Sequence, residues 1–256
     1  MQAVGFGTRI RWQLNSALAI AAKDARIYYL KPPVLIFGIV FPIFIFSAFI
    51  IGRNISADIL LPGLIGMTLI FTASSSTPGI APWETARMTL ERLISTPASI
   101  AAIISGDILA GFLYGLFITL VALFIGVLIL GASIISPLIL AADIIISAFC
   151  FAALGSLLST LPTDNPSNIM LVSNLVRLPL LFISGVFIPI ERLPSWGKAI
   201  SAFSPLTYSC DLARHALLGD GYFPVPFGLS VLLAFTVGFY FIGIQIHKKS
   251  MPLRLS

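Results

Sequence analysis

The sequence predicts an all-α integral membrane protein, and three observations support this prediction. Hydrophobic residues make up 58% of the 256-residue chain and charged residues only 10%, whereas a soluble domain carries roughly 25% charged residues. The apolar residues form runs as long as the roughly 20 residues that one helix needs to cross a bilayer. The connections between the runs are short, so residues 1–256 are expected to form one membrane domain.

Residues 1–33 are expected to form an amphipathic helix that lies in the membrane interface. Apolar residues recur there at helical spacing among basic residues. The apolar positions are Leu14, Leu18, Ala21, Ala22, Ala25 and Tyr29. Lys31-Pro32-Pro33 ends the helix, because proline disfavours helical backbone in the residue before it. A solvated basic tail is the alternative interpretation.

Six transmembrane helices are expected within residues 34–246, followed by a tail at 247–256. Their approximate bounds are 34–52, 59–81, 99–130, 134–161, 169–190 and 225–246. The fifth apolar stretch is expected to be broken by Asn174, Arg177, Pro179 and Gly185. The connection after it contains two short helical patterns separated at Ser204-Pro205. These short helices either re-enter the outer leaflet or lie flat on the outer surface.

An even number of spans places both tails on the same side, and the distribution of Lys and Arg identifies that side as the cytoplasm. The face with the tails carries Arg9, Arg11, Lys23, Arg26, Lys31, Arg87, Arg92, Lys248, Lys249 and Arg254. The opposite face carries only Arg53, Arg192, Lys198 and Arg214. The sequence therefore predicts a multi-pass protein of the cell membrane with both termini in the cytoplasm.

A charged segment at 82–97 interrupts the apolar sequence between the second and third spans. Glu84, Arg87, Glu91 and Arg92 place opposite charges three and four residues apart, a spacing that stabilises a helix. A cytoplasmic helix of this kind is expected to be a docking surface for a soluble partner. The alternative is a loop whose charges are only solvated.

The motifs of several enzyme classes are absent. The chain has no phosphate-binding glycine loop and no His-Glu-x-x-His zinc signature. Cys150 and Cys210 form no metal-binding spacing, and His215 and His247 are expected to be solvated or interfacial. We therefore expect no catalytic residues, no metal and no cofactor bound by this chain.

Three ionisable residues lie within the expected spans, where such residues are functional candidates by default. Asp107 is expected to reach the head groups, and Arg177 to extend to the inner face. Asp143 either has a direct transport role or makes a polar contact between helices.

Ser74-Ser75-Ser76-Thr77-Pro78 lies inside the second span. Ser74, Ser75 and Thr77 either line a substrate path or allow a close helix contact. Pro78 leaves a backbone carbonyl free, which these hydroxyl groups are expected to satisfy.

Two stretches resemble the type-2 class of ABC-transporter permeases. Residues 84–99, ETARMTLERLISTPAS, are similar to a motif E-x3-G-T-L-E-x-L-x-x-T-P-x-S. Residues 182–196, FISGVFIPIERLPSW, together with SPLTY at 204–208 and DLAR at 211–214, resemble the motifs F-x-S-G-x-x-x-P-x-x-x-L-P and N-P-L-T-Y-x-x-D-x-x-R. The chain departs from the pattern at Met88, where glycine is usual, and at Ser204, where asparagine is frequent; helical packing is expected to tolerate both changes.

The resemblance implies a permease subunit of an ATP-driven exporter. A separate ATPase subunit would use ATP and dock on Glu84, Arg87, Glu91 and Arg92. A second permease copy, identical or different, would complete the pore in contact with membrane lipids, with no role for nucleic acid. Gly185, Pro189, Pro205 and Tyr208 belong to the segments that would line or close the outer exit. The alternatives are a membrane-embedded enzyme acting on lipid and a stand-alone channel or scaffold; the substrate is not indicated.

Overall fold

A computed structural model describes residues 6–50, 57–161 and 165–250, and these residues form helices and connections without a β-strand. Five helical segments in this part of the chain are long and apolar enough to cross a membrane. They are Leu60–Ala86, Ile100–Leu128, Pro137–Leu158, Pro166–Ile183 and Val225–Ser250. The prediction of an all-α multi-pass membrane protein is confirmed.

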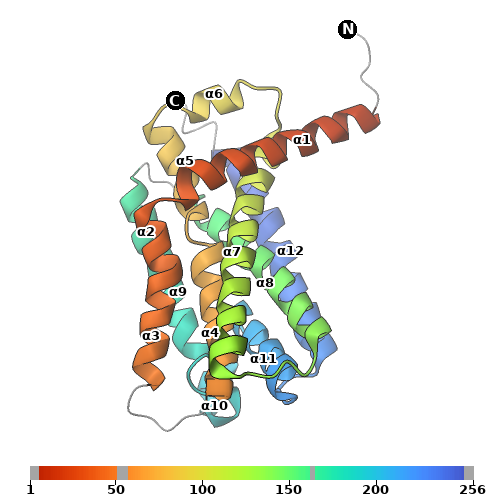
Figure 1. Ribbon diagram of the computed structural model, residues 1–256. Coiled ribbons are helices and arrows are strands. Elements are labelled where there is room, and N and C mark those ends of the chain that lie inside the picture. Colours follow the sequence, from red (N-terminus) through yellow and green to blue (C-terminus); the bar gives the residue numbers. More distant parts are fainter. Residues whose placement is uncertain (1–5, 51–56, 162–164, 251–256) are drawn as a thin grey trace.

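The long helices run side by side, and shorter helices cover the two ends of the bundle (Figure 1). The first helix, α1 (Phe6–Asp24), crosses one end together with α6 (Leu90–Ile94). The last residues of α12 (Val225–Ser250) lie at the same end. We call this end the α1–α6 end. The opposite end holds α10 (Ser195–Ser201) and α11 (Pro205–Leu218), and we call it the α10–α11 end.

The amino-terminal helix forms as expected and continues into a π-helical turn, η1 (Ala25–Tyr29). Its apolar residues divide between two faces. Ala17, Ile20 and Ala21 are buried against the bundle, whereas Leu14 and Leu18 are 60% and 57% exposed. An exposed apolar face beside a membrane protein is what an interfacial helix presents to lipid.

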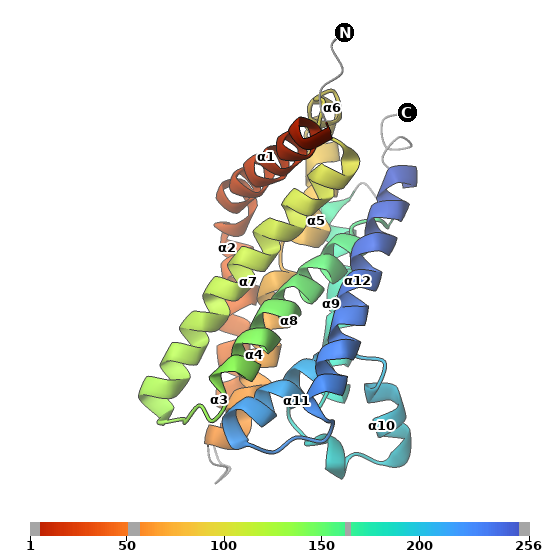
Figure 2. The same cartoon turned by 90° about the vertical axis from the view of Figure 1, so that its right-hand side faces the viewer.

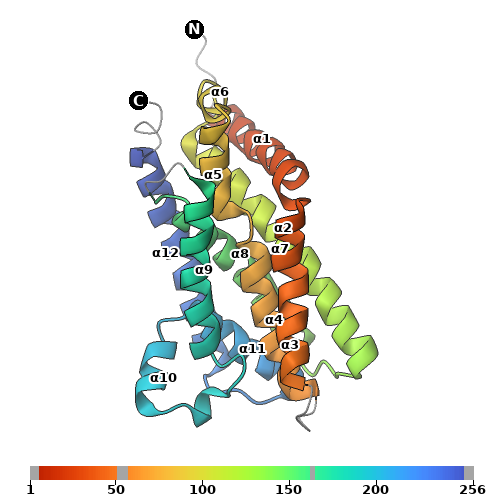
Figure 3. The same ribbon diagram turned by 90° about the vertical axis from the view of Figure 1, so that its left-hand side faces the viewer.

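The first expected span is formed by three consecutive helical segments. These are α2 (Pro32–Leu35), η2 (Ile36–Val40) and α3 (Phe41–Ile50), which form one continuous rod beside α4 in Figure 3. The rod is not among the five segments above, so the count of six spans stays a prediction. Residues 51 and 52 of this expected span lie outside the described residues, as does Arg53.

The second span is divided into two helices. α4 (Ala57–Ala73) is followed by α5 (Thr77–Ala86), and Ser74, Ser75 and Ser76 between them are not helical. The span also extends beyond the expected end at residue 81, because α5 carries Pro82, Trp83 and Glu84 as part of the helix.

The remaining spans are close to their expected positions. α7 covers Ile100–Leu130 with Ser99 as its N-cap, and α8 covers Pro137–Leu158. α9 (Pro166–Ile183) is unbroken through Asn174, Arg177 and Pro179, so the expected interruption at these residues is wrong. The helix ends before Gly185, which has a φ of 79° and turns the chain.

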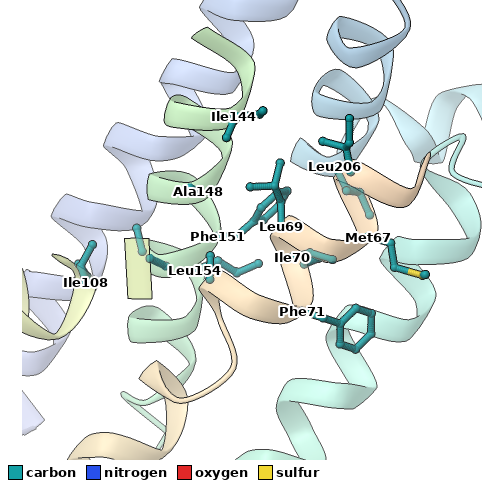
Figure 4. Packing of buried hydrophobic residues seen from close by; sticks show 14 of the residues in the cluster. Met67, Leu69, Ile70, Phe71, Ile108, Ile144, Ala148, Phe151, Leu154 and Leu206 are labelled. Atoms are coloured by element: carbon teal, nitrogen blue, oxygen red, sulfur yellow. The ribbon is translucent and has the colours of Figure 1, made fainter. Parts of the chain in front are cut away.

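The core of the bundle lies where α4, α8 and α11 meet. Figure 4 shows Leu69 and Ile70 of α4 beside Ala148, Phe151 and Leu154 of α8. Figure 2 shows α7, α8 and α12 running alongside one another on one side of this core, with α11 below.

The connection between α9 and α12 contains the two short helices that the sequence predicts, preceded by a 3-10 turn η3 (Ile190–Arg192). They are separated at Ser204 and Pro205 as expected. α10 is largely exposed, whereas most of α11 is buried among α4, α8 and α12. Irregular or re-entrant backbone at membrane depth requires such a protein cover, so α11 fits the re-entrant alternative better than the flat one.

Candidate functional site

The charged segment of the sequence forms a sharp corner between two helices, not the single helix that was expected. α5 ends at Ala86 and α6 begins at Leu90. Between them Met88 has a φ of 54°, a left-handed conformation that favours glycine. The expectation that helical packing would tolerate methionine here is therefore wrong, because the position is a turn. We call residues 86–94 the charged corner.

Three of the predicted docking residues are exposed on this corner. Arg87 follows α5, whereas Glu91 and Arg92 are on α6. Met88 is 71% exposed beside them. The corner therefore presents charges of both signs and one flexible apolar side chain at the α1–α6 end of the bundle.

The corner is attached firmly to the rest of the protein. Leu90 is buried, and the backbone N–H of Thr89 donates to the Glu84 carbonyl at 2.9 Å. The α6 segment leads into α7, where the side chain of Gln13 from α1 accepts hydrogen bonds from the backbone N–H and the hydroxyl of Ser99, both at 2.9 Å. A force on the corner would therefore reach α1, α5 and α7 directly.

The fourth predicted docking residue, Glu84, is buried and does not face solvent. Its carboxylate pairs with Lys23 of α1, whose Nζ also lies 3.0 Å from Oδ1 of Asp24. Burial lowers the pKa of Lys23, but the Asp24 and Glu84 carboxylates outweigh it and raise the pKa overall. This ion pair joins α1 to α5 inside the protein.

An aromatic stack covers the same junction. The rings of Tyr28 and Trp83 lie 5.3 Å apart with an interplanar angle of 11°. Nζ of Lys31 lies 4.5 Å from the Trp83 ring centre and 4.8 Å from that of Tyr28. Burial and the neighbouring Glu84 carboxylate raise the pKa of Tyr28 to about 12. The tyrosine is therefore neutral at physiological pH.

Asp107 does not reach towards head groups, and this expectation is wrong. It lies on the first turns of α7, is 5% exposed, and faces the Asp24 carboxyl group of α1. The sequence showed both acids, but nothing in the sequence placed them together, because the crossing of α1 over α7 brings them into contact.

Arg177 does not extend to the inner face either. Its side chain is 3% exposed, and it donates from Nη2 to the backbone carbonyl of Ser74 in the break between α4 and α5. The missing helical hydrogen bonds of the break thus gain a charged donor from α9. An arginine inside an apolar span was expected to extend to the membrane surface, whereas the break between α4 and α5 provides a nearer carbonyl partner.

The candidate path residues of the second span are buried inside the subunit. Ser74 and Ser75 donate to the carbonyls of Ile70 and Thr72. A side-chain carbon at Gly155 would lie 2.0 Å from the Thr77 hydroxyl oxygen, so α8 approaches the break very closely. This geometry fits the close helix contact, the alternative to a substrate path.

Asp143 lies on α8, and its hydrogen-bond partner Ser147 is one turn further along the same helix, so the choice between a transport role and a polar contact between helices stays a prediction. The residue is fully buried and accepts a hydrogen bond from Ser147 at 2.7 Å.

His247 is also fully buried, with Nε2 at 3.1 Å from the Ser159 hydroxyl oxygen and 3.0 Å from the Ser156 carbonyl. The expectation of a solvated or interfacial His247 is therefore wrong. His215 is half-buried, with its Nε2 at 2.7 Å from the Phe223 carbonyl.

The predicted outer-exit residues gather at the α10–α11 end. Tyr208 donates to the Ala202 carbonyl at 2.9 Å, and Pro205 occupies the first turn of α11. Gly185 and Pro189 lie in the connection between α9 and η3. The hydroxyl groups of Ser184 and Ser204 are 2.6 Å apart, and this contact joins the two segments that the sequence motifs had selected.

A bundle of long apolar helices with an exposed charged corner at one end defines a multi-pass helical membrane protein. No group of three or more His, Cys, Asp or Glu side chains that could hold a metal occurs in the described part of the chain. The family model for the ABC-2 type transporter matches residues 16–218, so the chain belongs to this family. The match includes the end of α1 from residue 16 on, the charged corner and the whole of α11.

Three relatives illustrate the family. The inner membrane transport permease YadH of Escherichia coli K12 is 27% identical over 232 residues, covering 88% of this chain and 89% of the relative. The probable multidrug ABC transporter permease YbhS of the same strain is 26% identical over 203 residues, covering 78% of this chain and 53% of the relative. Nodulation protein J of Rhizobium leguminosarum bv. viciae is 30% identical over 108 residues, covering 42% of this chain and 41% of the relative.

Proposed function

We propose that this chain is the permease subunit of an ATP-driven exporter and that a separate ATPase docks on its charged corner. The observation that carries the proposal is the exposed corner with Arg87, Glu91 and Arg92, attached at once to α1, α5 and α7. An isolated solvated loop would not need these attachments. The ATPase would bind and use the ATP, because this chain lacks a phosphate-binding glycine loop.

Glu84 has a different role from the other three docking residues. Since its carboxylate pairs with Lys23 inside the protein, it transmits movement to α1 and does not contact the ATPase. The exposed charges of the corner make the contact instead. Both faces of this interface are cytoplasmic in the proposed orientation, which agrees with the excess of Lys and Arg at this end.

A second permease copy would pack along α9. Leu171, Leu175, Leu178 and Phe182 are exposed and recur at spacings of four, three and four residues, so they form one apolar stripe on α9. A cysteine at Leu175 in a chain lacking Cys150 and Cys210 should form a cross-linked dimer in the membrane. Cysteine at Leu233, an exposed position on α12, is the matched control and should not cross-link.

The substrate would be an amphipathic molecule that leaves between the two copies. Ser74, Ser75, Thr77 and Asp143 are buried within one subunit, which favours a path along the subunit surface. The α10–α11 end, with Gly185, Pro189, Pro205 and Tyr208, would then form the exit. The relative YbhS is named a probable multidrug ABC transporter permease, which supports drugs as one candidate class of substrate.

The chain contains a matched pair of sites for testing the coupling surface. Glu91-Arg92 lies on the charged corner, and the same dipeptide recurs as Glu191-Arg192 in η3 at the opposite end. All four side chains are exposed. The double charge swap E91K/R92E should abolish the stimulation of a co-expressed ATPase and stop export, whereas E191K/R192E should leave the stimulation intact. Equal effects of the two swaps, with equal amounts of inserted protein, would refute the assignment.

Orientation and the rival functions have their own tests. Thr89→Cys should react with an impermeant thiol reagent in inverted vesicles and not in intact cells; labelling in intact cells would reverse the proposed orientation.

Purified chain in liposomes should conduct no solute without the ATPase. A flux through the chain alone would favour a stand-alone channel, and turnover of lipid would favour an enzyme.

A further inference from the structure

The crossing of α1 over α7 contains more acid than base. Three carboxyl groups meet there: Asp24 of α1, Glu84 of α5 and Asp107 of α7. They are 0%, 4% and 5% exposed. The only cation in contact with them among the described residues is Lys23. A buried carboxylate without a cation is very unfavourable, so this group of residues cannot hold three negative charges at once.

The contacts show where the excess charge lies. Lys23 contacts Glu84 and Asp24, and Asp107 faces Asp24 without a cation of its own. Within the described structure, Oδ2 of Asp24 and Oδ1 of Asp107 receive no hydrogen bond from an N–H or O–H group although both are buried. Two carboxyl groups that face each other in this way are stable when one proton lies between them.

The other charged and titratable groups around the pair do not replace that proton. Those that face it from the adjoining elements are Lys23, Tyr28, Tyr29, Glu84 and Arg177. Tyr29 lies close to both acids. Arg177 lies on the other side of Tyr29 and donates its Nη2 hydrogen bond to the Ser74 carbonyl, not to the acids. Burial raises the pKa of Asp24, and the hydrogen bond to Asp107 and the Lys23 charge lower it by less.

The backbone at the crossing makes the pair depend on close contact of the two helices. A side-chain carbon at Gly106, next to Asp107, would lie 2.7 Å from Ile20 Cβ and 2.8 Å from the Ala17 carbonyl oxygen. α1 therefore rests directly on the α7 backbone, and the π-helical turn η1 begins one residue after Asp24. Separation of the helices would admit water to both acids and let both ionise.

We propose that Asp24 and Asp107 form a proton-binding site, which keeps one proton while α1 and α7 are packed and releases it when they separate. The ligand is a proton, and the site is distinct from the exposed surface of the charged corner. Acid conditions then favour the packed arrangement, and alkaline conditions favour separation. The proposal does not depend on the proposed function, because it concerns a property of the isolated chain.

The direction of the pH effect follows from linkage. A carboxyl group whose pKa is raised in the packed state gives a stabilisation that is complete below its ordinary pKa, about 4. That stabilisation is lost as the pH rises through the raised pKa of Asp24. Asparagine at position 107 keeps the size and hydrogen-bonding capacity of the side chain but needs no proton, so D107N should remove the loss.

Two measurements on the purified full-length chain in lipid nanodiscs test the site. The infrared difference spectrum between the unmodified chain and D107N near neutral pH should contain the C=O band of a protonated carboxyl group, whereas the difference spectrum between the unmodified chain and E84Q should not. Thermal unfolding should show a midpoint that falls with rising pH in the unmodified chain, and D107N should flatten this dependence and unfold at a higher temperature under alkaline conditions. E84Q should unfold at a lower temperature at neutral pH, because it breaks the ion pair with Lys23.

The opposite signs of D107N and E84Q make the outcome decisive. If Asp107 were an ionised partner of Lys23, both variants would destabilise the protein and D107N would lose no protonated-carboxyl band. That result would overturn the proposal and leave the coupling function untouched. Conversely, failure of the E91K/R92E test would refute the coupling surface without affecting the proton site.

Discussion

The two ends of the bundle are held together by different forces. At the α1–α6 end, Lys23, Asp24, Glu84 and Asp107 form a buried group of charged side chains. At the α10–α11 end most contacts are neutral hydrogen bonds, such as that between Ser184 and Ser204, and contacts between tilted aromatic rings, such as Tyr208 and Phe223 with ring centres 5.2 Å apart. Charged contacts respond to pH and to a charged partner, whereas neutral contacts respond much less. We therefore expect the packing of the α1–α6 end to depend on pH and on nearby charge more than the packing of the α10–α11 end does.

The largest effect is expected from reversing the central charge of the ionic end. Lys23→Glu would place a fourth carboxylate beside three buried ones, and we expect a loss of about 3 kcal/mol or more in the free energy of unfolding. Lys198→Glu is the control at the other end, where Lys198 lies 5.6 Å from the Tyr222 ring centre, and should cost about 1 kcal/mol or less. Thermal unfolding measures both, and equal losses would remove the contrast between the two ends.

The second effect concerns a buried carboxylate at the α10–α11 end. Asp211 accepts the backbone N–H groups of Tyr222 and Phe223 at 2.7 and 2.9 Å, which closes the connection from α11 to α12. Asp211→Ala should cost about 2 to 3 kcal/mol, since it leaves two donors without an acceptor. Asp211→Asn keeps one acceptor oxygen and should cost about half as much. Hydrogen exchange at residues 222 and 223 locates the change, and slow exchange in both variants would contradict it.

A third, smaller effect is expected from wedging the two crossing helices apart. Gly106→Val would place side-chain atoms against Ile20 and the Ala17 carbonyl. Overpacking of this kind costs about 1 to 3 kcal/mol. A cysteine at the buried position Ala17 should then react with thiol reagents faster than in the unmodified background. Gly238→Val, with open space around the added carbon, serves as the control and should leave that reactivity unchanged.

The smallest effect should be a gain. Met88→Gly removes a side chain from a left-handed backbone position, where a non-glycine residue costs about 1 kcal/mol or slightly more. Part of the gain is lost to the greater freedom of glycine in the unfolded chain, so an increase of about 0.5 kcal/mol is expected. A small rise in the unfolding temperature would show it. A decrease would mean that the exposed methionine side chain itself makes a stabilising contact.

The sequence predicts the helices well because each long apolar run must form its own backbone hydrogen bonds. Ser99 and Pro137 begin α7 and α8, and the break at Ser204-Pro205 follows from the missing N–H of proline. These features depend on neighbouring residues alone. The charged segment at 82–97 was also recognised from neighbouring residues alone, but its turn between α5 and α6 was not predicted.

The contacts between distant residues could not be read in this way. Asp24 and Asp107 meet because Gly106 lets α1 approach α7, and no local pattern records that approach. Arg177 and His247 were assigned to lipid or water, whereas α9 and α12 turn them towards carbonyl and hydroxyl groups of neighbouring helices. Met88 is the exception, since the glycine that is usual at this place in similar sequences was itself a sign of a left-handed turn.

The interruption at Ser74–Ser76 makes the second span two rods instead of one. α4 is anchored in the core against α8 and α11, whereas α5 is joined to α1 through Glu84 and Lys23. The two rods share a short pivot that the guanidinium of Arg177 holds in place. A tilt imposed on α5 can therefore change the angle between α5 and α4 at this pivot while α4 keeps its packing in the core.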